Sequence, residues 1–420
     1  MKAACPAQNQ GSRDQTMTVP FPRMGLCAAA LAAFLSFAAG TELTNEEQAV
    51  LRSAKQGDIV RLDTFLEGRS DLPSIPIQIQ PVSGPQLLLS DKPEYLLSGD
   101  GITLREEVKP GRVRLYLYHV PTPGDVPKAI SAVVENLSTR PLRLNLTRRA
   151  FPRPGTDYHL IGKTGLLDYF NSRPEKATVK LSPGERTVLD SQLDATTVTR
   201  DQLVHGFYEF EINGPARVTV FQRGVAEGSL QVLDTLPLLP QKLPMKEIGN
   251  GAGRGLFPIS NFHVTNARGL RLDTTNGAQQ LIIANGKSEG WVKGYDSIEA
   301  RATRNTGNYG VLYRIRLTRT SSDGRSLALL MCKINSGSRW CAAQAGAVQV
   351  SKGAWPGGTV AIPGNCVSFG KPGEAVVVQK FLPVRKGKTE TIEIMYSPPG
   401  ASCIPTPMIF VPYHESTPRR

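Results

Sequence analysis

The sequence predicts a mainly β protein with two β-sandwich domains, the first immunoglobulin-like and the second jelly-roll-like, after a signal peptide and a short helical segment. Short segments of alternating apolar and polar residues recur along most of the chain, and this pattern is typical of half-buried strands. The 40 glycines and 32 prolines stand between these segments as turn residues. With 420 residues, of which 40% are hydrophobic, the chain is long enough for more than one core.

The N-terminus has the pattern of an export signal. Residues 25–40 read GLCAAALAAFLSFAAG, an uncharged run that is too short and too rich in alanine to anchor well in a bilayer. Small residues end this run and predict cleavage between Gly40 and Thr41, with residues 1–40 as the signal peptide. We therefore expect an exported protein of the periplasm, the cell surface or the extracellular space. An uncleaved signal that anchors the chain in the membrane is the alternative.

Residues 41–71 form the predicted short helical segment. Thr44 and Glu47 have the spacing of a capping box, and apolar residues follow at helical intervals as far as Leu66. Gly57 and Asp58 interrupt the pattern, so either one helix over residues 44–66 or two short helices fit it. The segment cannot bury an apolar face by itself, and we expect it to dock on a neighbouring domain.

Residues 72–235 are predicted to form the immunoglobulin-like sandwich. Regularly spaced short strands with turn residues between them are typical of that fold. Asn213 and Gly214 stand between two alternating segments, which predicts a hairpin. A short helix is expected over residues 158–170. The predicted strands cover residues 77–80, 113–120, 129–136, 142–148, 177–181, 205–212 and 216–222.

Residues 236–255 are predicted to be a linker that holds the two sandwiches apart. The prolines of residues 236–244 predict a stiff, extended part, and the glycine run over residues 249–255 its flexible continuation. Residues 256–412 are predicted to form the second sandwich, because eight or more strands without a long helix are typical of a jelly roll. Residues 321–324 are expected to turn a central hairpin, and residues 413–420 to be a frayed tail. The strands predicted here cover residues 269–273, 279–284, 311–318, 326–334, 347–350, 359–362, 375–381 and 391–396.

Four cysteines follow the signal peptide, and all lie in the second predicted sandwich. An even number of cysteines within one domain of an exported protein predicts two disulfides. Cys332 and Cys341 flank a turn, so we favour a bond between them and a second bond between Cys366 and Cys403. Zinc is the weaker interpretation, because no close pair of cysteines is present.

Only one segment has the pattern of a catalytic motif. Ser288 lies in a G-x-S-x-G sequence, and Asp296 or Asp323 and then His414 follow in the order that an α/β-hydrolase uses. That mechanism needs a helix directly after the serine, whereas the sequence after Ser288 has the pattern of a strand. We therefore predict no catalytic residue and no cofactor. No metal site is predicted either, because none of the five histidines has metal-ligand spacing to another: His119, His159, His205, His263 and His414.

Aromatic residues near turns are the more promising binding feature. Trp291, Trp340 and Trp355 form a candidate glycan platform, and Tyr295 and Tyr309 also fall near turns. Aromatic rings stack on the apolar faces of sugars, although large aromatic residues more often serve burial. Packing in cores and loops is therefore the competing interpretation.

The net charge indicates an anionic partner. The chain carries +13, and the signal region has three basic residues and one acidic residue, so 13 − 2 leaves +11 on the remainder. Such a surface attracts anionic polymers, or it is simply a solvated basic surface. We expect an anionic cell-wall polymer, a glycan or another envelope protein as the partner. Export argues against nucleic acid, and the membrane is a partner only through an uncleaved signal.

Several stretches resemble an uncharacterised family of exported bacterial envelope proteins. They are AISAVVENLSTRPLRLNLTRRAF from Ala129, VHGFYEFEINGPARVTV from Val204, NYGVLYRIRL from Asn308 and SPPGASCIPTP from Ser397. The resemblance implies β-sandwich domains like those of surface proteins that sometimes carry copper-amine-oxidase N-terminal-like or S-layer modules. It implies no activity and no site residues, and this sequence shows no such extra module.

These features predict a non-enzymatic exported protein of the cell envelope or surface, with a structural or binding role. The alternative is a carbohydrate-binding protein that acts on cell-wall or extracellular glycans through the three tryptophans. A serine hydrolase that uses Ser288 is the second alternative.

Overall fold

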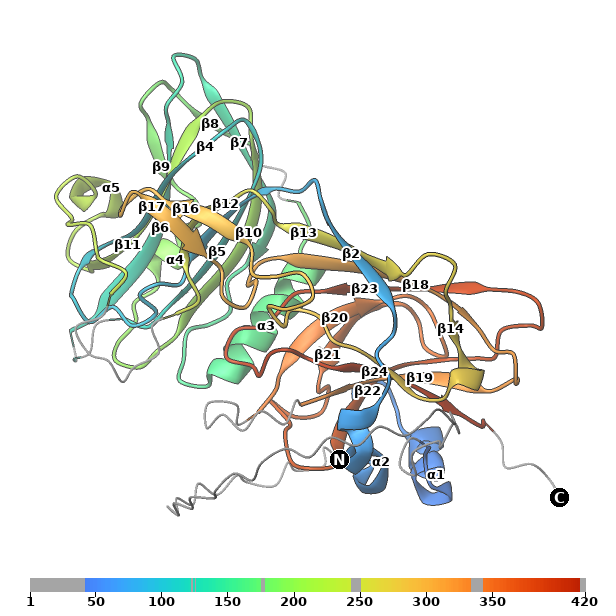
Figure 1. Ribbon diagram of the computed structural model, residues 1–420. Coiled ribbons are helices and arrows are strands. Elements are labelled where there is room, and N and C mark those ends of the chain that lie inside the picture. The colour runs from blue at the N-terminus through green and yellow to red at the C-terminus, as the bar shows by residue number, and fades with distance from the viewer. Residues whose placement is uncertain are drawn as a thin grey trace, which may run out of the picture.

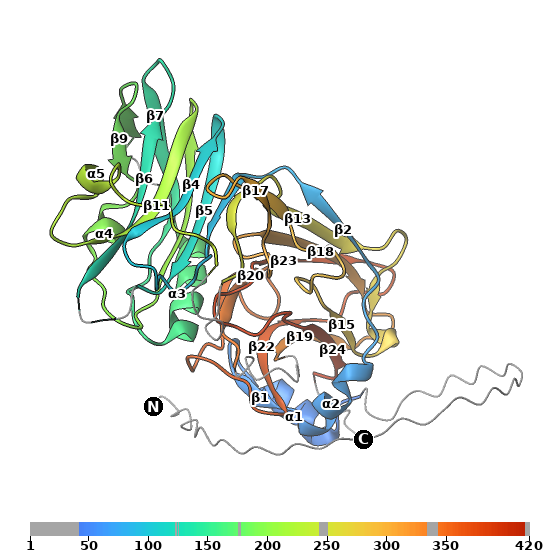
Figure 2. The same cartoon turned by 60° about the vertical axis from the view of Figure 1, so that its left-hand side comes forward.

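The computed structural model describes residues 42–121, 124, 126–174, 178–242, 251–333 and 343–415. The predicted signal peptide lies outside these residues. Strands dominate the described chain and helices are few, which confirms the prediction of a mainly β, sandwich-like fold. The sheets form two sandwiches that lie side by side, with helix α3 (Tyr158–Asn171) at their junction (Figure 1, Figure 2).

The first sandwich packs an eight-stranded sheet on a four-stranded sheet. The eight-stranded sheet has the order β17-β16-β12-β3-β5-β10-β7-β8, and its only parallel pair joins β3 to β5. Apolar side chains such as Leu115, Val134 and Val218 fill the space between the sheets. The strands of the eight-stranded sheet are β3 (Gln86–Ser90), β5 (Gly111–His119), β7 (Leu142–Ala150), β8 (Thr178–Leu181), β10 (Val204–Ile212), β12 (Arg254–Phe257), β16 (Lys293–Asp296) and β17 (Arg301–Arg304). The four-stranded sheet, in the order β4-β11-β6-β9, contains β4 (Gly101–Val108), β6 (Lys128–Asn136), β9 (Arg186–Val188) and β11 (Ala216–Gly224).

The second sandwich packs a seven-stranded sheet on a five-stranded sheet. The seven-stranded sheet runs β2-β13-β18-β23-β20-β21, and β14 pairs with β18 beside this path. Its strands are β2 (Ile77–Val82), β13 (Asn261–Asn266), β14 (Leu272–Asp273), β18 (Leu312–Thr320), β20 (Gly346–Val350), β21 (Gly358–Ile362) and β23 (Glu390–Tyr396). The five-stranded sheet runs β1-β22-β19-β24-β15 and contains β1 (Ile59–Arg61), β15 (Gln279–Leu281), β19 (Ser326–Cys332), β22 (Glu374–Phe381) and β24 (Met408–Tyr413).

The predicted helical segment covers the outer face of the five-stranded sheet. Alternate residues of β19 enter two cores: Leu329 packs between the sheets, whereas Leu330 packs with Leu51 and Phe65 of the helical segment. Lys380 of β22 donates to the carbonyl oxygens of Arg52 and Ala54 at the end of the first helix.

The predicted docking and the capping box at Thr44 are confirmed. A continuous helix is not formed, because the interruption at Gly57 and Asp58 leads into β1 between α1 (Asn45–Ser53) and α2 (Asp63–Glu67). The remaining short helices are α4 (Ser191–Ala195), α5 (Ser229–Val232), η1 (Gly68–Asp71) and η2 (Thr274–Asn276).

The sheets do not follow the predicted domain boundaries. Strand β2, from the predicted first sandwich, pairs with β13 in the second. Strands β12, β16 and β17, from the predicted second sandwich, extend the eight-stranded sheet of the first. Composition along the chain marks where turns occur, but strand pairing is decided over long sequence distances, so the chain crosses between the sandwiches four times.

The prediction that a linker holds the sandwiches apart is wrong. Leu239 is 3% exposed, and the backbone of Ile102 in β4 exchanges hydrogen bonds with Pro237 and Leu239. One hydrophobic cluster also runs from Tyr116 of the first sandwich through Leu166 of α3 into the second sandwich. The prolines predict a stiff, solvent-exposed segment, yet Leu239 is buried and the backbone pairs with β4, whereas Leu238 is 48% exposed. The rest of the predicted linker, residues 243–250, lies outside the described residues.

Two predicted hairpins are wrong for a common reason. The turn at Asn213 and Gly214 joins β10 to β11, and the turn at residues 321–324 joins β18 to β19, but in each case the two strands belong to opposite sheets. Pro215 follows the first turn and has no N–H group to close a two-residue hairpin. The predicted frayed tail begins instead with Tyr413, the last residue of β24 and 1% exposed.

Candidate functional site

A cleft of about 510 Å³ opens where the two sandwiches meet. Its walls come from β5, the start of α3, the loop after β3 and three loops on the second half of the chain. We call it the tyrosine cleft, and the residues that define it are Asp91, Glu94, Tyr95, Tyr116, Tyr118, Tyr158, His159, Gly251, Ala252, Thr306, Tyr309, Gly400, Ala401 and Ser402.

The loop after β3 brings two carboxylates to the tyrosine cleft, and His119 holds that loop in place. His119 Nδ1 lies 2.9 Å from the carbonyl oxygen of Pro93, and because a carbonyl only accepts, Nδ1 carries the proton. His119 Nε2 therefore accepts from the hydroxyl of Ser90 at 2.8 Å. Burial lowers the pKa of His119 to about 4, so its ring is neutral near pH 7 and serves as a fixed structural contact.

Gly251 and Ala252, just before β12, pack against the other side of this loop. The amide of Ala252 donates to Asp91 Oδ2 at 2.8 Å. Gly251 has a φ of 76°, and a Cβ atom added there would come within 1.4 Å of the backbone oxygen of Asp91. Only glycine lets the chain pass so close to Asp91. The position of this carboxylate is thus set by the packing of two segments that are far apart in sequence.

Aromatic rings form the opposite wall. Tyr116 and Tyr118 alternate with the leucines of β5, so both rings leave the same face of the sheet. These two rings are parallel within 9°, with centroids 6.5 Å apart. The ring of Tyr309 stands 6.0 Å from that of Tyr116, across the junction of the sandwiches. Tyr95 and Tyr158 complete the aromatic wall.

Burial controls the ionisation of the groups that line the tyrosine cleft. Burial raises the pKa of Asp91 well above its usual range, and the nearby charge of Glu94 adds to the shift. Burial alone raises the pKa of Glu94 to about 7. Burial also raises the pKa of the tyrosines and lowers that of His159, so the hydroxyls remain protonated and the imidazole stays neutral at pH 7. The cleft therefore combines neutral hydroxyl donors with two carboxyl groups.

Two buried polar atoms in the wall of the tyrosine cleft have no hydrogen-bond partner. They are Asp91 Oδ1 and Tyr116 Oη, and both residues are at least nine-tenths buried. A buried polar group without a partner costs free energy, and such groups in native proteins are rare enough to need an explanation. A polar ligand in the cleft would supply the missing partners.

Two of the candidate tryptophans, Trp291 and Trp355, do not line the tyrosine cleft. Trp291 is half-buried and packs on Gly286, whereas Trp355 is half-buried under Lys380 beside the helical segment. Trp340 lies outside the described residues. The structure brings only Tyr309, among the aromatic residues singled out from the sequence, into the cleft. One sequence signal could have revealed Tyr116 and Tyr118. They alternate with the leucines of β5 and therefore lie together on the opposite face of the strand.

The predicted disulfides involve Cys332, Cys341, Cys366 and Cys403. Cys366 and Cys403 are disulfide-bonded, Cys332 is buried at the end of β19, and Cys341 lies outside the described residues. The predicted pairing of Cys332 with Cys341 and of Cys366 with Cys403 stays a prediction. Peptide mapping of the non-reduced protein is expected to yield one peptide that joins residues 366 and 403, and a peptide that joins either residue to Cys341 would contradict the pairing.

The predicted hydrolase residues do not come together. Ser288 is exposed in a turn, where its hydroxyl contacts the amide of Asn285, and β16 rather than a helix follows it. Asp296 is fully buried in an ion pair with Arg254, 2.8 Å apart. His414 lies at the other end of the chain, beside the helical segment, where its carbonyl accepts from Arg52.

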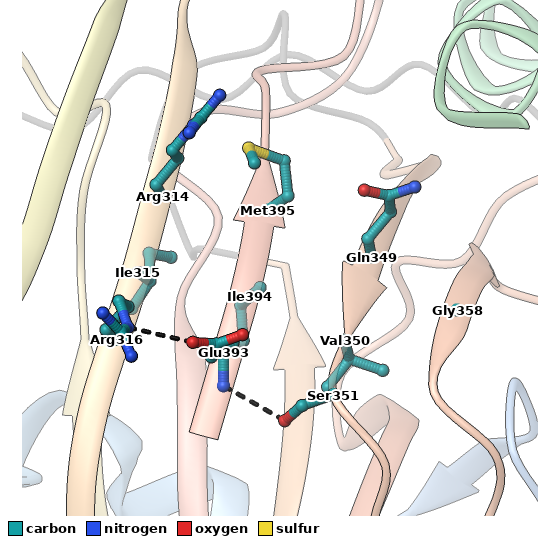
Figure 3. Close-up of a pocket in the computed structure, with 10 residues that line it drawn as sticks. All are labelled: Arg314, Ile315, Arg316, Gln349, Val350, Ser351, Gly358, Glu393, Ile394 and Met395. Carbon is teal, nitrogen blue, oxygen red and sulfur yellow. Dashed lines mark hydrogen bonds and ion pairs between the residues drawn. The ribbon is translucent and has the colours of Figure 1, made fainter. Parts of the chain in front are cut away.

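A second hollow of about 570 Å³ lies on the face of the seven-stranded sheet (Figure 3). It runs over β18, β23 and β20, and the close-up shows Arg316 directed at Glu393. Arg316 Nε lies 2.9 Å from Glu393 Oε1, and both side chains are more than half exposed. Exposed pairs of this kind are well solvated, so no group here requires a ligand. The tyrosine cleft is the stronger candidate for this reason.

Other kinds of site find little support in the part of the chain that the structure describes. There, no three His, Cys, Asp or Glu side chains gather into a group that could hold a metal ion. Among the described helices, none is both long enough and apolar enough to cross a membrane.

Comparisons with known proteins do not identify a relative. No family model matches the chain, and no curated protein matches it. Among solved structures, the human MASP-1/3 CUB1-EGF-CUB2 domain is 7% identical with a TM-score of 0.17, over 74% of this chain and 99% of that one. The 7S globulin of Momordica charantia is 8% identical with a TM-score of 0.12, over 74% and 72%. A mutant of Bacillus subtilis oxalate decarboxylase is 11% identical with a TM-score of 0.11, over 80% and 79%. Scores this low carry no argument about function.

The fold and the site define a mainly β protein with a tyrosine-lined cleft between two sandwiches.

Proposed function

We propose that this protein is a non-enzymatic, exported binding protein of the cell envelope, and that the tyrosine cleft holds a saccharide. The observation that carries the proposal is the composition of the cleft. Five tyrosines and two carboxyl groups converge on one space of about 510 Å³, which lies within the size range of small-molecule sites.

The chemistry of the lining matches that of a sugar. A pyranose ring has apolar C–H faces that stack on aromatic rings, and hydroxyl groups that both donate and accept hydrogen bonds. The half-buried rings of Tyr95, Tyr158 and Tyr309 would supply stacking surface. Asp91 and Glu94 would accept from hydroxyl groups. A ligand of this kind would also provide partners for the unpaired atoms Asp91 Oδ1 and Tyr116 Oη. Support for export comes from the signal-like N-terminus of the sequence.

Replacement of Tyr309 by alanine tests the saccharide proposal. The purified protein is first screened against immobilised cell-wall oligosaccharides, and the best soluble ligand is titrated by calorimetry. Tyr309→Ala is expected to weaken binding by about 3- to 10-fold, because one aromatic stacking contact is worth about 0.5–1.5 kcal/mol.

Tyr295→Ala is the matched control, since Tyr295 is 50% exposed on β16 and does not line the tyrosine cleft. This variant is expected to bind like the unchanged protein. Equal binding by both variants, with both folded, would place the sugar elsewhere. No binding by any oligosaccharide would reject the proposal.

A further inference from the structure

The tyrosine cleft is lined by acidic groups, whereas the protein as a whole is basic. The chain as a whole carries a net charge of +13, yet no lysine or arginine lines this cleft. Its ionisable lining consists of two carboxyl groups, five tyrosines and His159, which is neutral at pH 7. A local acidic site on a basic protein repels anions and attracts cations.

The carboxyl groups of the cleft also lack the ion pairs that three other buried carboxylates of this protein form. Asp296, Glu209 and Asp190 are buried, and each forms an ion pair with an arginine at 2.6–2.8 Å. By contrast, Asp91 accepts one backbone hydrogen bond at Oδ2 and none at Oδ1. Within the described chain, the side chain of Glu94 forms no hydrogen bond or ion pair. Two adjacent carboxyl groups are thus left without an ion pair in the described chain, and the charge of Lys92 acts on Asp91 only without direct contact.

The aromatic wall suits a cation as well as a sugar ring. An ammonium group within about 6 Å of a tyrosine ring is attracted to its π face, and the attraction grows when water is excluded. The rings of Tyr95, Tyr158 and Tyr309 line the same space as Glu94. Tyr116 Oη, which has no partner, ends beside Gly400, another lining residue. The unpaired atoms, the rings and the carboxyl groups therefore point to one ligand with both hydroxyl and ammonium groups.

We infer that the ligand of the tyrosine cleft is an amino sugar with a free ammonium group, which sits against Asp91 and Glu94. This inference rests on the proposed saccharide function and names the class of saccharide. The ammonium group pairs with the two carboxyl groups and favours their ionised form, and the sugar ring packs on the tyrosines.

Two oligosaccharides that differ only at nitrogen test the inference. A glucosamine hexamer carries free amines, whereas an N-acetylglucosamine hexamer has the same backbone without the charge. We expect the glucosamine hexamer to bind about tenfold tighter or more at neutral pH, as measured by calorimetry. In the Glu94→Gln variant, which keeps the shape of the side chain, this preference is expected to fall to nearly one.

Glu393→Gln is the matched control, because Glu393 is an exposed carboxylate in the hollow of Figure 3. It is expected to keep the full preference for the free amine. Loss of the preference in Glu393→Gln but not in Glu94→Gln would overturn the inference and move the site to the sheet.

The remaining outcomes separate the inference from the proposed function. Equal binding of both hexamers, unaffected by Glu94→Gln, would overturn the inference and leave saccharide binding standing. Binding of the polyamine spermidine that depends on Glu94, without binding of either hexamer, would reject the saccharide and with it the amino-sugar inference, leaving only a cation site. The absence of binding by all three compounds would reject both.

Discussion

Replacement of Arg114 by methionine is expected to lower the free energy of unfolding by about 3–5 kcal/mol, the usual cost of removing one partner from a buried ion pair. Arg114 is 1% exposed and pairs with Glu209 through two nitrogens, at 2.6 and 2.8 Å. It also donates to the backbone oxygens of Ser260 and Gly310, at 2.8 and 2.9 Å. Those two residues lead into the second sandwich, so a single guanidinium ties β5 to the neighbouring half of the molecule.

Arg112→Met is the matched control for this change. Arg112 lies two residues earlier on β5 and is exposed, so its replacement is expected to change stability by no more than about 0.5 kcal/mol. Urea unfolding at neutral pH, followed by tryptophan fluorescence, measures both variants. If the two variants differ by less than about 1 kcal/mol, Arg114 does not hold the sandwiches together as described. Adding Glu209→Gln to Arg114→Met is expected to recover part of the loss, because it removes the uncompensated charge.

Replacement of Glu94 by glutamine is expected to stabilise the protein by roughly 2–3 kcal/mol at about pH 8 and to have little effect near pH 4.5. The folded pKa of Glu94 is about 7 because of burial, whereas its ordinary value is 4.5. The folded protein thus holds this proton more strongly than the unfolded chain. The resulting stabilisation is fully present below pH 4.5 and is lost as the pH rises to 7. Glutamine cannot ionise, so the variant escapes this loss.

Unfolding measured from pH 4.5 to 8 tests this expectation, with Glu393→Gln as the control. Glu393 is more than half exposed, and its replacement is expected to change stability by less than about 1 kcal/mol at every pH. The titratable groups that interact with Glu94 are Asp91 on its own loop and the five cleft tyrosines Tyr95, Tyr116, Tyr118, Tyr158 and Tyr309, and they are unchanged in both variants. A pH profile of Glu94→Gln that runs parallel to that of the unchanged protein would contradict the raised pKa. Stabilisation by removal of an ionisable group is expected at a binding site, where function is favoured over stability.

Strand β5 shows which features the local sequence pattern predicts and which it does not. The alternation over residues 113–120 predicts a half-buried strand, and the strand is present at Gly111–His119. Its leucines face the core of the first sandwich as expected. The other face, with Arg114, Tyr116 and Tyr118, is buried as well, against α3 and the second sandwich. In an alternating sequence pattern, arginine and tyrosine predict a solvent-facing side of the strand. Tertiary contacts can nevertheless satisfy their polar groups, and the side chains are then buried.

Strand β24 is a strand that the local sequence pattern does not predict. Prolines precede it at residues 405 and 407, and another lies within it at 412, so the segment has the pattern of a loop. It nevertheless lies between β19 and β15 in the five-stranded sheet. The sequence predicts both neighbouring strands, β15 and β19. Nothing in residues 408–413 indicates that this segment pairs with them.

The sequence by itself determined the mainly β fold, the positions of most strands, the capping box at Thr44 and the need for the helical segment to dock. Each of these depends on residues within a few positions of one another, where periodicity and turn chemistry act directly. Only the tertiary structure decided which strands share a sheet, that the two sandwiches share a core, and that the tyrosine cleft exists. The cleft gathers residues from 91 to 402, and no spacing along the chain encodes a meeting of segments that far apart. Its unpaired carboxyl groups become visible as a site only when burial removes the water that would otherwise satisfy them.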